Sequence, residues 1–200
     1  TTQKGRIVSG LYKEKSHAII PIKRCIIQDP KADEILKTIR KIFKKYNMRT
    51  YNEYTKQGFL RHVLIRTGYH TDEVMVVFVV VHNRFHSRSK IIKELIQAHP
   101  DISTILMNIN DRETSVVLGD HEKVLYGNGK IKDSLCGLDF LISSKSFYQV
   151  NPQQTEKLYK KAMDYADLKK TDTVLDAYCG IGTIGLIAAQ EVKNVYGIEN

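Results

Sequence analysis

The sequence has no tryptophan, only three cysteines and no long hydrophobic run. Its longest apolar run, from Val74 to Val81, has the length of a β-strand. A membrane-spanning helix needs roughly 18 or more consecutive apolar residues, so no span is expected. The first residues also lack the order of charged, apolar and small residues that marks a signal peptide. We therefore expect no membrane partner and no secretory targeting.

The cysteines argue against a disulfide framework. Cys25, Cys136 and Cys179 are odd in number and form no C-x-x-C pair. Such usage fits a reducing compartment, and we expect a cytoplasmic protein. Cys25 has no other potential metal ligand beside it, so it is expected to be a small core residue, and no metal site is predicted.

The charge that is present is unevenly distributed. The chain has 200 residues, 42% hydrophobic and 26% charged, which suits one large domain or two small ones. Residues 1–66 hold 16 Lys/Arg and 5 Asp/Glu, whereas the rest hold 15 and 17. Aromatic residues are interleaved with the basic ones: Tyr12, Tyr46, Tyr51, Tyr54 and Phe59. This composition predicts contact with RNA or DNA through phosphates and stacked bases, although a solvated lysine-rich helix face would look similar.

The hydrophobic pattern of the first 130 residues predicts a compact α+β unit. Short strands are expected in residues 6–8 and 18–22, and a helix begins at Asp29-Pro30 and ends near Asn47. Strands are expected at 60–66, 74–81, 104–109 and 115–118, with a helix after Ser87, its predicted cap. The segment 121–136 is predicted as a glycine-rich connection between domains 1–130 and 131–200.

The segment from Leu138 to Pro152 is predicted to run as a strand into the start of a helix. Asn151 stands at the N-cap and Pro152 at the first helical position. The helix is expected over 152–167, with an inner side of four residues: Leu158, Tyr159, Ala162 and Tyr165.

A glycine-rich turn between a strand and a helix follows. Residues 173–177 are predicted as a strand, and Gly180, Gly182 and Gly185 open a helix. A second β-branched run, 195–198, ends on Glu199. Glycines let a ligand approach the backbone, and an acid after the second strand can accept hydrogen bonds from ribose hydroxyls, so the pattern fits an adenosine.

Three interpretations of this turn are open. The glycine spacing matches the dinucleotide pattern G-x-G-x-x-G, with Glu199 about 20 residues after the first glycine. Asp176 argues against it, because a dinucleotide-binding strand usually runs apolar into the turn. The pattern Asp-x-x-x-Gly-x-Gly resembles instead the first motif of S-adenosylmethionine-dependent methyltransferases. A helix packed on a sheet by small residues, without a ligand, is the third interpretation.

Longer motifs resemble one family, the bacterial RNA uracil-5-methyltransferases that use S-adenosylmethionine on tRNA or 23S rRNA. Ser146-Phe-Tyr-Gln-Val-Asn-Pro152 is similar to that family's S-F-x-Q-x-N segment, and Asp176-Ala-Tyr-Cys-Gly-Ile-Gly182 to its cofactor loop. Residues 10–17, 60–62, 110–119 and 125–127 resemble its central domain. The resemblance spans nearly the whole chain and is closest to the ribosomal RNA enzymes of Gram-positive bacteria.

The resemblance implies a fold class and a cofactor site. The fold is an α+β central domain followed by the start of an α/β Rossmann-like S-adenosylmethionine methyltransferase domain, which is incomplete here. The implied cofactor-binding residues are Gln149, Tyr178, Gly180, Gly182, Thr183 and Glu199. The implied partner is RNA, with rRNA preferred to tRNA.

The resemblance also implies a covalent mechanism. A cysteine thiolate adds to C6 of the uracil, C5 takes the methyl group, and a carboxylate then removes the C5 proton. In the family both groups lie after the second sheet strand, where this chain has ended, so no catalytic residue is assigned and we expect the chain alone to be inactive. Cys179 lies inside the cofactor loop and is not the expected nucleophile, and Cys25 lies roughly where the last ligand of an iron–sulfur cluster stands in some members. An RNA-binding module is the main alternative function, and an NAD-dependent oxidoreductase the third.

Overall fold

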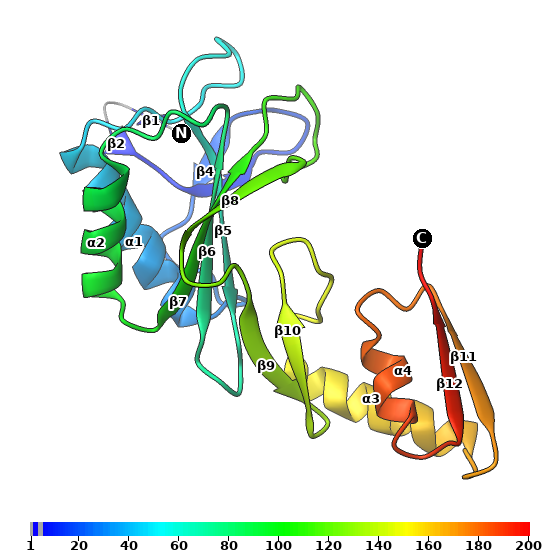
Figure 1. Cartoon of the computed structure of the whole chain (residues 1–200). Helices are drawn as coiled ribbons and strands as arrows, with labels where there is room; N and C mark the ends of the chain where they lie inside the picture. The colour runs from blue at the N-terminus through cyan, green and yellow to red at the C-terminus, as the bar shows by residue number, and fades with distance from the viewer. Residues whose placement is uncertain (1, 4–5) are drawn as a thin grey trace. The chain divides into compact units, whose positions relative to one another are not determined.

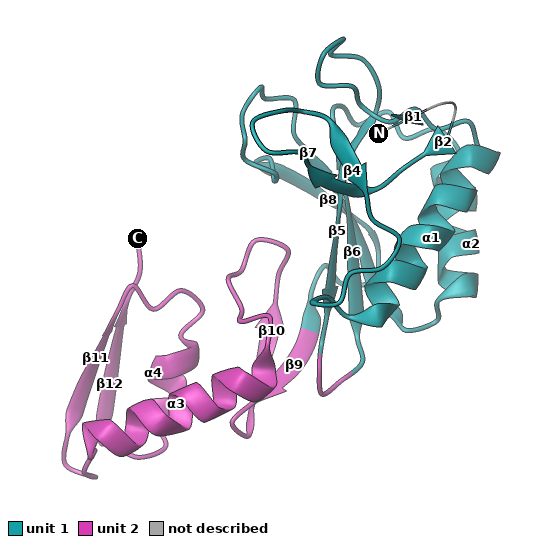
Figure 2. Cartoon of the chain, turned by 180° about the vertical axis from the view of Figure 1, so that it is seen from behind, with its two compact units in different colours: residues 1–68, 72–131 teal, residues 69–71, 132–200 magenta. Residues whose placement is uncertain are grey.

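The computed structural model describes residues 2–3 and 6–200 and divides the chain into two compact units (Figure 2). Unit 1 comprises residues 1–68 and 72–131, and unit 2 comprises residues 69–71 and 132–200. The division into functional domains at 130/131 stays a prediction. The elements, labelled in Figure 1, are β1 (Thr2–Gln3), β2 (Arg6–Ile7), β3 (Gly10–Tyr12), β4 (Ile19–Pro21), α1 (Pro30–Lys45), β5 (Leu60–Thr67), β6 (Val74–Val80), α2 (Arg88–Ala98), β7 (Ile102–Ile109), β8 (His121–Tyr126), β9 (Ile131–Leu135), β10 (Leu138–Ile142), α3 (Pro152–Ala166), β11 (Thr173–Ala177), α4 (Thr183–Ala188) and β12 (Asn194–Ile198).

Unit 1 is built on a four-stranded mixed sheet with the order β5-β6-β7-β8. β5 and β8 are antiparallel to their neighbours, while β6 and β7 are parallel and joined through α2. Every residue of β6 is buried, as its unbroken apolar sequence predicts for a central strand.

Helices α1 and α2 lie side by side on one face of this sheet (Figure 1). The Asp29 side chain caps α1 by accepting a hydrogen bond from the Lys31 N–H at 2.8 Å. The buried stripe of α1 packs with apolar residues of α2 and the sheet to form the main core, which includes Ile35, Ile39, Phe43, Val76, Phe78, Ile91, Leu95 and Ile105. The predicted helix end is confirmed, since Tyr46 follows the last turn and Asn47 has φ 51°.

The N-terminal segment forms two short antiparallel pairs, β1 with β2 and β3 with β4. The strands expected in residues 6–8 and 18–22 correspond to β2 and β4. β1 and β3 were not predicted, because a strand of two or three residues is too short to show an alternating pattern.

The strand expected at residues 115–118 is wrong. This segment is an irregular loop in which the Val116 and Val117 side chains are 55% and 42% exposed. The buried Asn110 side chain donates hydrogen bonds to the carbonyls of both valines, at 2.8 and 2.9 Å. Those carbonyls therefore accept hydrogen bonds from the Asn110 side chain and do not pair with a neighbouring strand.

The last strand of the sheet, β8, begins at His121, inside the segment expected to be a connection. A second buried asparagine, Asn108, holds the loop before it. Its side-chain amide donates to the Gly119 carbonyl at 3.0 Å, and its oxygen accepts from the Gly119 N–H at 2.6 Å. The loop and the start of β8 are thus set by buried side-chain amides, which hydrophobic periodicity does not detect.

The predicted capping role of Ser87 is also wrong. Ser87 precedes α2 with a left-handed backbone, φ 54°, and its side chain makes no capping hydrogen bond. In this conformation the hydroxyl does not reach the free amides of the first turn.

Unit 2 begins with the β9–β10 hairpin and continues into α3. Asn151 caps α3 as predicted, because its side-chain oxygen accepts from the Gln154 N–H at 3.2 Å. Tyr159 is buried, but Leu158 and Tyr165, expected on the inner side, are exposed. The inner side of the helix was therefore predicted correctly at Tyr159 and wrongly at Leu158 and Tyr165.

Within the described ranges, no helix is both long and apolar enough to cross a bilayer. The same residues contain no group of three or more His, Cys, Asp and Glu placed to hold a metal ion. All three cysteines are free, and the backbone N–H of Cys25 donates to the Asp33 carboxylate at 3.1 Å.

Candidate cofactor-binding site

The predicted cofactor residues of the glycine turn lie at one end of the β11–β12 pair. The two strands are parallel, and Ala177 pairs with Ile198. Because the carboxyl ends of parallel strands meet at the same edge, Tyr178 and Glu199 leave the sheet next to each other.

The loop 178–182 turns sharply and is tied to the second strand. The Cys179 N–H donates to the Ile198 carbonyl at 3.1 Å, and the Gly182 N–H donates to the Cys179 carbonyl at 2.8 Å. Gly180 and Gly182 have φ of 56° and 78°, which glycine adopts without strain. Tyr178 has φ 62° with a side chain 89% exposed, so an aromatic ring is held out of the loop at some backbone cost.

Asp176 organises the start of α4. Its Oδ2 accepts a hydrogen bond from the Gly185 N–H at 2.9 Å. A Cβ at Gly185 would lie 2.7 Å from that oxygen, so only glycine fits without moving the carboxylate. The sequence singled out both Asp176 and Gly185 but not the hydrogen bond between them.

Glu199 and Gly180, predicted to share a site, are in direct contact. Glu199 Oε2 accepts the Gly180 N–H at 2.7 Å, while Oε1 has no hydrogen-bond partner among the described residues. The carboxylate is exposed, so the loop is fixed through one oxygen and the other remains free to accept a ligand hydroxyl.

Cys179 faces the neighbouring strand. A Cβ at Gly197 would lie 3.0 Å from its sulfur, so the thiol occupies the space that a side chain would take there. This supports the sequence-based view that Cys179 has a structural place in the loop.

Thr183, the first residue of α4, is held from α3. The Thr183 hydroxyl lies 3.1 Å from the Tyr159 hydroxyl, within hydrogen-bonding distance. Tyr159 was predicted only as a packing residue of the helix. The contact between the two hydroxyls could not be predicted from the sequence, because the helical pattern of α3 does not show which group the Tyr159 hydroxyl contacts.

Gln149 is half-buried in the segment between β10 and α3, and no described residue forms a hydrogen bond with its side chain. The structure therefore does not join it to the loop directly. Its neighbour Tyr148 is buried, and burial followed by the nearby Asp133 carboxylate raises the pKa of the Tyr148 hydroxyl. The backbone N–H of His70 donates to Asp133 at 2.8 Å. The residue before Gln149 is thus buried, whereas the Gln149 side-chain amide keeps no hydrogen-bond partner among the described residues.

The electrostatics of the loop separate the two nucleotide chemistries. A dinucleotide places its diphosphate against the first amides of the helix. In this chain the Gly185 amide already binds the Asp176 carboxylate, whose negative charge would repel a diphosphate. The arrangement suits a ligand with ribose hydroxyls and no phosphate at this position.

Comparison with curated proteins finds relatives that cover almost the whole chain. A Staphylococcus aureus protein named an uncharacterized RNA methyltransferase is 42% identical over 197 residues, which are 98% of this chain and 44% of the relative. An Enterococcus faecalis protein of the same description is 45% identical over 194 residues, 97% of this chain and 42% of the relative. The chain thus spans less than half the length of these relatives. No protein-family model matches it.

Comparison with solved structures also finds similar proteins. The Pyrococcus abyssi tRNA (uracil-54, C5)-methyltransferase, solved in complex with S-adenosyl-L-homocysteine, has a TM-score of 0.78 and is 27% identical. The match covers 94% of this chain and 44% of that one. Together with the curated relatives, it supports a relation to RNA methyltransferases.

Proposed function

We propose that this chain is part of an S-adenosylmethionine-dependent methyltransferase that modifies C5 of a uridine in RNA. The observation that carries the proposal is the loop in which Asp176 holds Gly185 and Glu199 holds Gly180. The chain that contains it resembles proteins named RNA methyltransferases, and a solved enzyme whose described substrate is a tRNA uracil.

The residues of the loop suit the adenosine part of this cofactor. Gly180 admits a ligand to the backbone, since a Cβ built there meets no atom within 4 Å. Glu199 Oε1 accepts a ribose hydroxyl, and the exposed Tyr178 ring offers a surface for the ligand. S-adenosylmethionine supplies an electrophilic methyl group when bound. Gly182, Thr183 and Gln149 complete the proposed set, with Gln149 contributing its free side-chain amide.

The proposed substrate is 23S rRNA, with tRNA as the competing target. The basic first third supports an RNA substrate, and the motif resemblance favours the ribosomal type, whereas the similar solved structure is a tRNA enzyme. A uridine-C5 assay with the two RNAs, using the protein extended to the length of its relatives, distinguishes them. Such an enzyme would act in the cytoplasm, where its RNA substrates are found.

We propose that the nucleophile and the base belong to the longer protein. The chain spans less than half of its curated relatives. Its own loop cysteine, Cys179, packs against Gly197 and is not placed here as a nucleophile. We expect release of the uridine C5 proton by the extended protein and none by the present chain.

The decisive experiment measures binding of S-adenosylhomocysteine by calorimetry to the extended protein. Glu199→Ala should abolish or strongly weaken binding, because ribose hydroxyls lose their acceptor. Glu191→Ala, which removes another exposed acid after α4, is the matched control and should leave binding unchanged. Binding of NAD in place of S-adenosylhomocysteine would contradict the proposal.

An RNA-binding module without catalysis is the second candidate, favoured by the charge of residues 1–66. It predicts RNA affinity that falls steeply with salt, and no effect of the cofactor. Calorimetry with S-adenosylhomocysteine separates the two, because the module should give no heat of binding.

A further inference from the structure

Unit 1 contains a cavity of about 430 Å³, far in sequence from the cofactor loop. It lies between the β3–β4 hairpin, α1, the segment 50–54 and the start of β5. This volume is within the range of small-molecule sites, about 300 to 1,000 Å³. Nothing in the proposed cofactor chemistry uses it.

Aromatic rings stand at the cavity and remain accessible. The His17 ring meets Tyr12 and Tyr54 edge to face, with centroid distances of 6.0 and 5.8 Å. Tyr12 is 45% exposed and Tyr54 70% exposed. Three rings from the hairpin and from the segment 50–54 thus line the cavity with exposed aromatic surface, and base–aromatic stacking tolerates any base.

A buried guanidinium lies in the cavity wall with one donor unused. The Arg61 side chain is 4% exposed. Its Nη1 donates to the carbonyls of Asn110 and Arg112 at 3.1 and 2.7 Å, and its Nη2 donates to Glu53 at 3.1 Å. Its Nε is buried and has no partner among the described residues. The guanidinium is thus part of the wall, held by two carbonyls and the Glu53 carboxylate.

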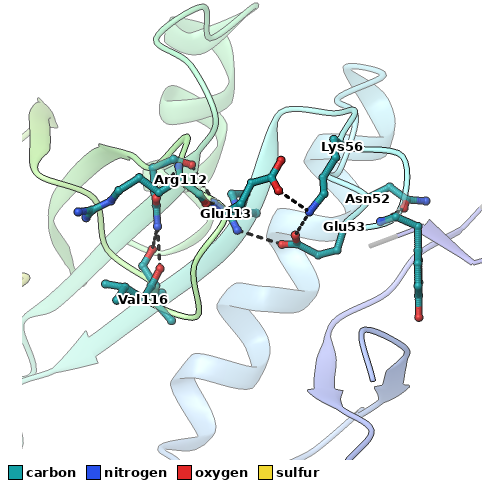
Figure 3. A network of polar contacts seen from close by, with 10 residues as sticks. Asn52, Glu53, Lys56, Arg112, Glu113 and Val116 are labelled. Atoms are coloured by element: carbon teal, nitrogen blue, oxygen red, sulfur yellow. Dashed lines mark hydrogen bonds and ion pairs between the residues drawn. The ribbon is translucent and has the colours of Figure 1, made fainter. Parts of the chain in front are cut away.

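The wall around Arg61 is held in place by ionic contacts. Figure 3 shows Lys56 between Glu53 and Glu113, at 3.8 and 3.6 Å. The Arg61 guanidinium also lies 5.0 Å from the centroid of the Tyr51 ring. The Arg61 guanidinium is therefore fixed in position before any ligand arrives.

The surroundings favour a polyanion over a peptide. The whole lining comes from residues 7–63 and balances Arg40 and Arg61 against Asp33 and Glu53. The excess of positive charge lies around it, since residues 1–66 hold 16 Lys/Arg and 5 Asp/Glu. Arg40 lines the cavity and donates from Nη1 to the Ser9 hydroxyl at 2.5 Å. Exposed lysines 13 and 15 follow Tyr12 in the hairpin. A nucleic acid strand has phosphates for these charges and bases for the rings.

We propose that this cavity binds one unstacked base of a single-stranded RNA, with the base against Tyr12 and Tyr54 and the fixed Arg61 guanidinium in the wall. The proposal rests on the proposed RNA substrate and adds to it a second anchoring point away from the cofactor loop. Such an anchor would hold the RNA strand while another nucleotide reacts.

The first test measures affinity of the present chain for a labelled oligouridylate of roughly ten nucleotides by fluorescence anisotropy, without cofactor. Tyr54→Ala should weaken binding by roughly 5- to 150-fold, the range for loss of one stacked base. The slope of affinity against salt should stay unchanged, because no charge is lost. Tyr165→Ala, an exposed tyrosine of α3 in unit 2, is the matched control and should have no effect.

A photocrosslink gives an independent readout. RNA carrying 4-thiouridine should crosslink to peptides that contain Tyr12, His17 or Tyr54, and double-stranded RNA should bind far more weakly. Equal affinities of Tyr54→Ala and Tyr165→Ala, crosslinks confined to other segments, or equally tight binding of duplex would each overturn the proposal. The proposal would also be overturned if a segment of the extended protein occupied the cavity. Tyr12 and Tyr54 would then be protected from solvent, and added RNA would not displace the segment.

These outcomes are separate from those of the cofactor experiment. If the unmodified chain binds no oligouridylate while the extended protein binds S-adenosylhomocysteine, the cavity proposal alone is overturned. If the present chain binds oligouridylate through Tyr54 but the extended protein does not bind S-adenosylhomocysteine, the methyltransferase proposal is overturned. A single-strand-binding module would remain.

Discussion

Asp176 and Gly185 form a pair in which each residue restricts the other. The carboxylate needs the Gly185 amide as its partner, and the absence of a Cβ at 185 is what lets it approach to 2.9 Å. Gly180 differs, because the space around it is open and only its φ of 56° restricts it. Two glycines of one motif are thus required for different physical reasons.

This difference makes a prediction for Gly185→Ala. Alanine is the better helix former by up to about 1 kcal/mol, but the new Cβ would lie 2.7 Å from Asp176 Oδ2 and must displace the carboxylate. We expect a net destabilisation of roughly 1–3 kcal/mol and loss of S-adenosylhomocysteine binding by the extended protein.

Gly180→Ala is the comparison. Alanine in the left-handed conformation at position 180 should lower the free energy of unfolding by about 1–2 kcal/mol. It should not displace Asp176. Urea unfolding of both variants, with Asp176→Ala combined with each, checks the mechanism. If the Gly185→Ala effect persists undiminished in the Asp176→Ala background, the carboxylate is not its cause.

A second prediction at this scale concerns pH and His62. Burial, and next the positive charge of Arg61, lower the pKa of His62 in the folded state. The unfolded chain therefore binds more protons than the folded chain as pH falls below the ordinary histidine value of about 6.5. The free energy of unfolding should therefore decrease as the pH is lowered through that window. Above the window, His62 should not make it depend on pH.

The measurement is urea unfolding at about pH 7.5 and about pH 5.5, on either side of the histidine value. His62→Gln should reduce the loss of stability between these two conditions, whereas His121→Gln, at an exposed position, serves as the control. An identical pH dependence in wild type and His62→Gln would show that the half-buried imidazole of His62 contributes nothing to it.

At the scale of the element, the sequence predicts correctly those helices and strands whose structure follows from their hydrophobic periodicity. Helix α1 and strand β6 were both located from their apolar patterns, because their burial alone decides their structure. The segment 115–118 has the same β-branched composition and yet forms a loop, since Asn110 binds the carbonyls of Val116 and Val117. A tertiary hydrogen bond to the backbone outweighs local propensity there, and it leaves no periodic signal.

The same limit applies to the candidate site. The turn glycines and Glu199 were found because their spacing along the chain encodes the strand–turn–helix geometry. Tyr159 was not found as a support of Thr183, because that contact depends on how α3 packs. Contacts between elements require the fold, whereas contacts within one turn are already present in the spacing.

Caps give a prediction at this scale. Asn151 accepts the Gln154 N–H at the start of α3, whereas Ser87 makes no such bond before α2. Asn151→Ala should destabilise the chain by about 1 kcal/mol, and Asn151→Asp should retain most of the stability. Ser87→Ala, the matched control, should change it by less than about 0.5 kcal/mol. Thermal unfolding of the three variants is the measurement, and equal losses at the two positions would contradict the cap assignment.

At the scale of the whole molecule, the two units differ in how much apolar surface they bury. Unit 1 packs two helices on a four-stranded sheet, with β6 buried along its length. In unit 2, the β11–β12 pair has two strands, and Leu175, Tyr196 and Ile198 remain largely exposed. A two-stranded sheet with an exposed apolar face contributes little stability of its own.

Unequal burial predicts unequal local stability. Amide hydrogens of β6 and β7 should exchange only through global unfolding, whereas those of β11 and β12 should exchange through local opening at a much lower free energy. Hydrogen exchange followed by mass spectrometry compares the peptides 74–80 and 194–198 in the present chain. In the protein extended to the length of its relatives, added packing on Tyr196 and Ile198 should slow exchange of the second peptide, and S-adenosylhomocysteine should slow it further by binding Glu199. Equal protection of the two peptides in the present chain would show that unit 2 is stable as it stands, and that its exposed apolar face costs it nothing.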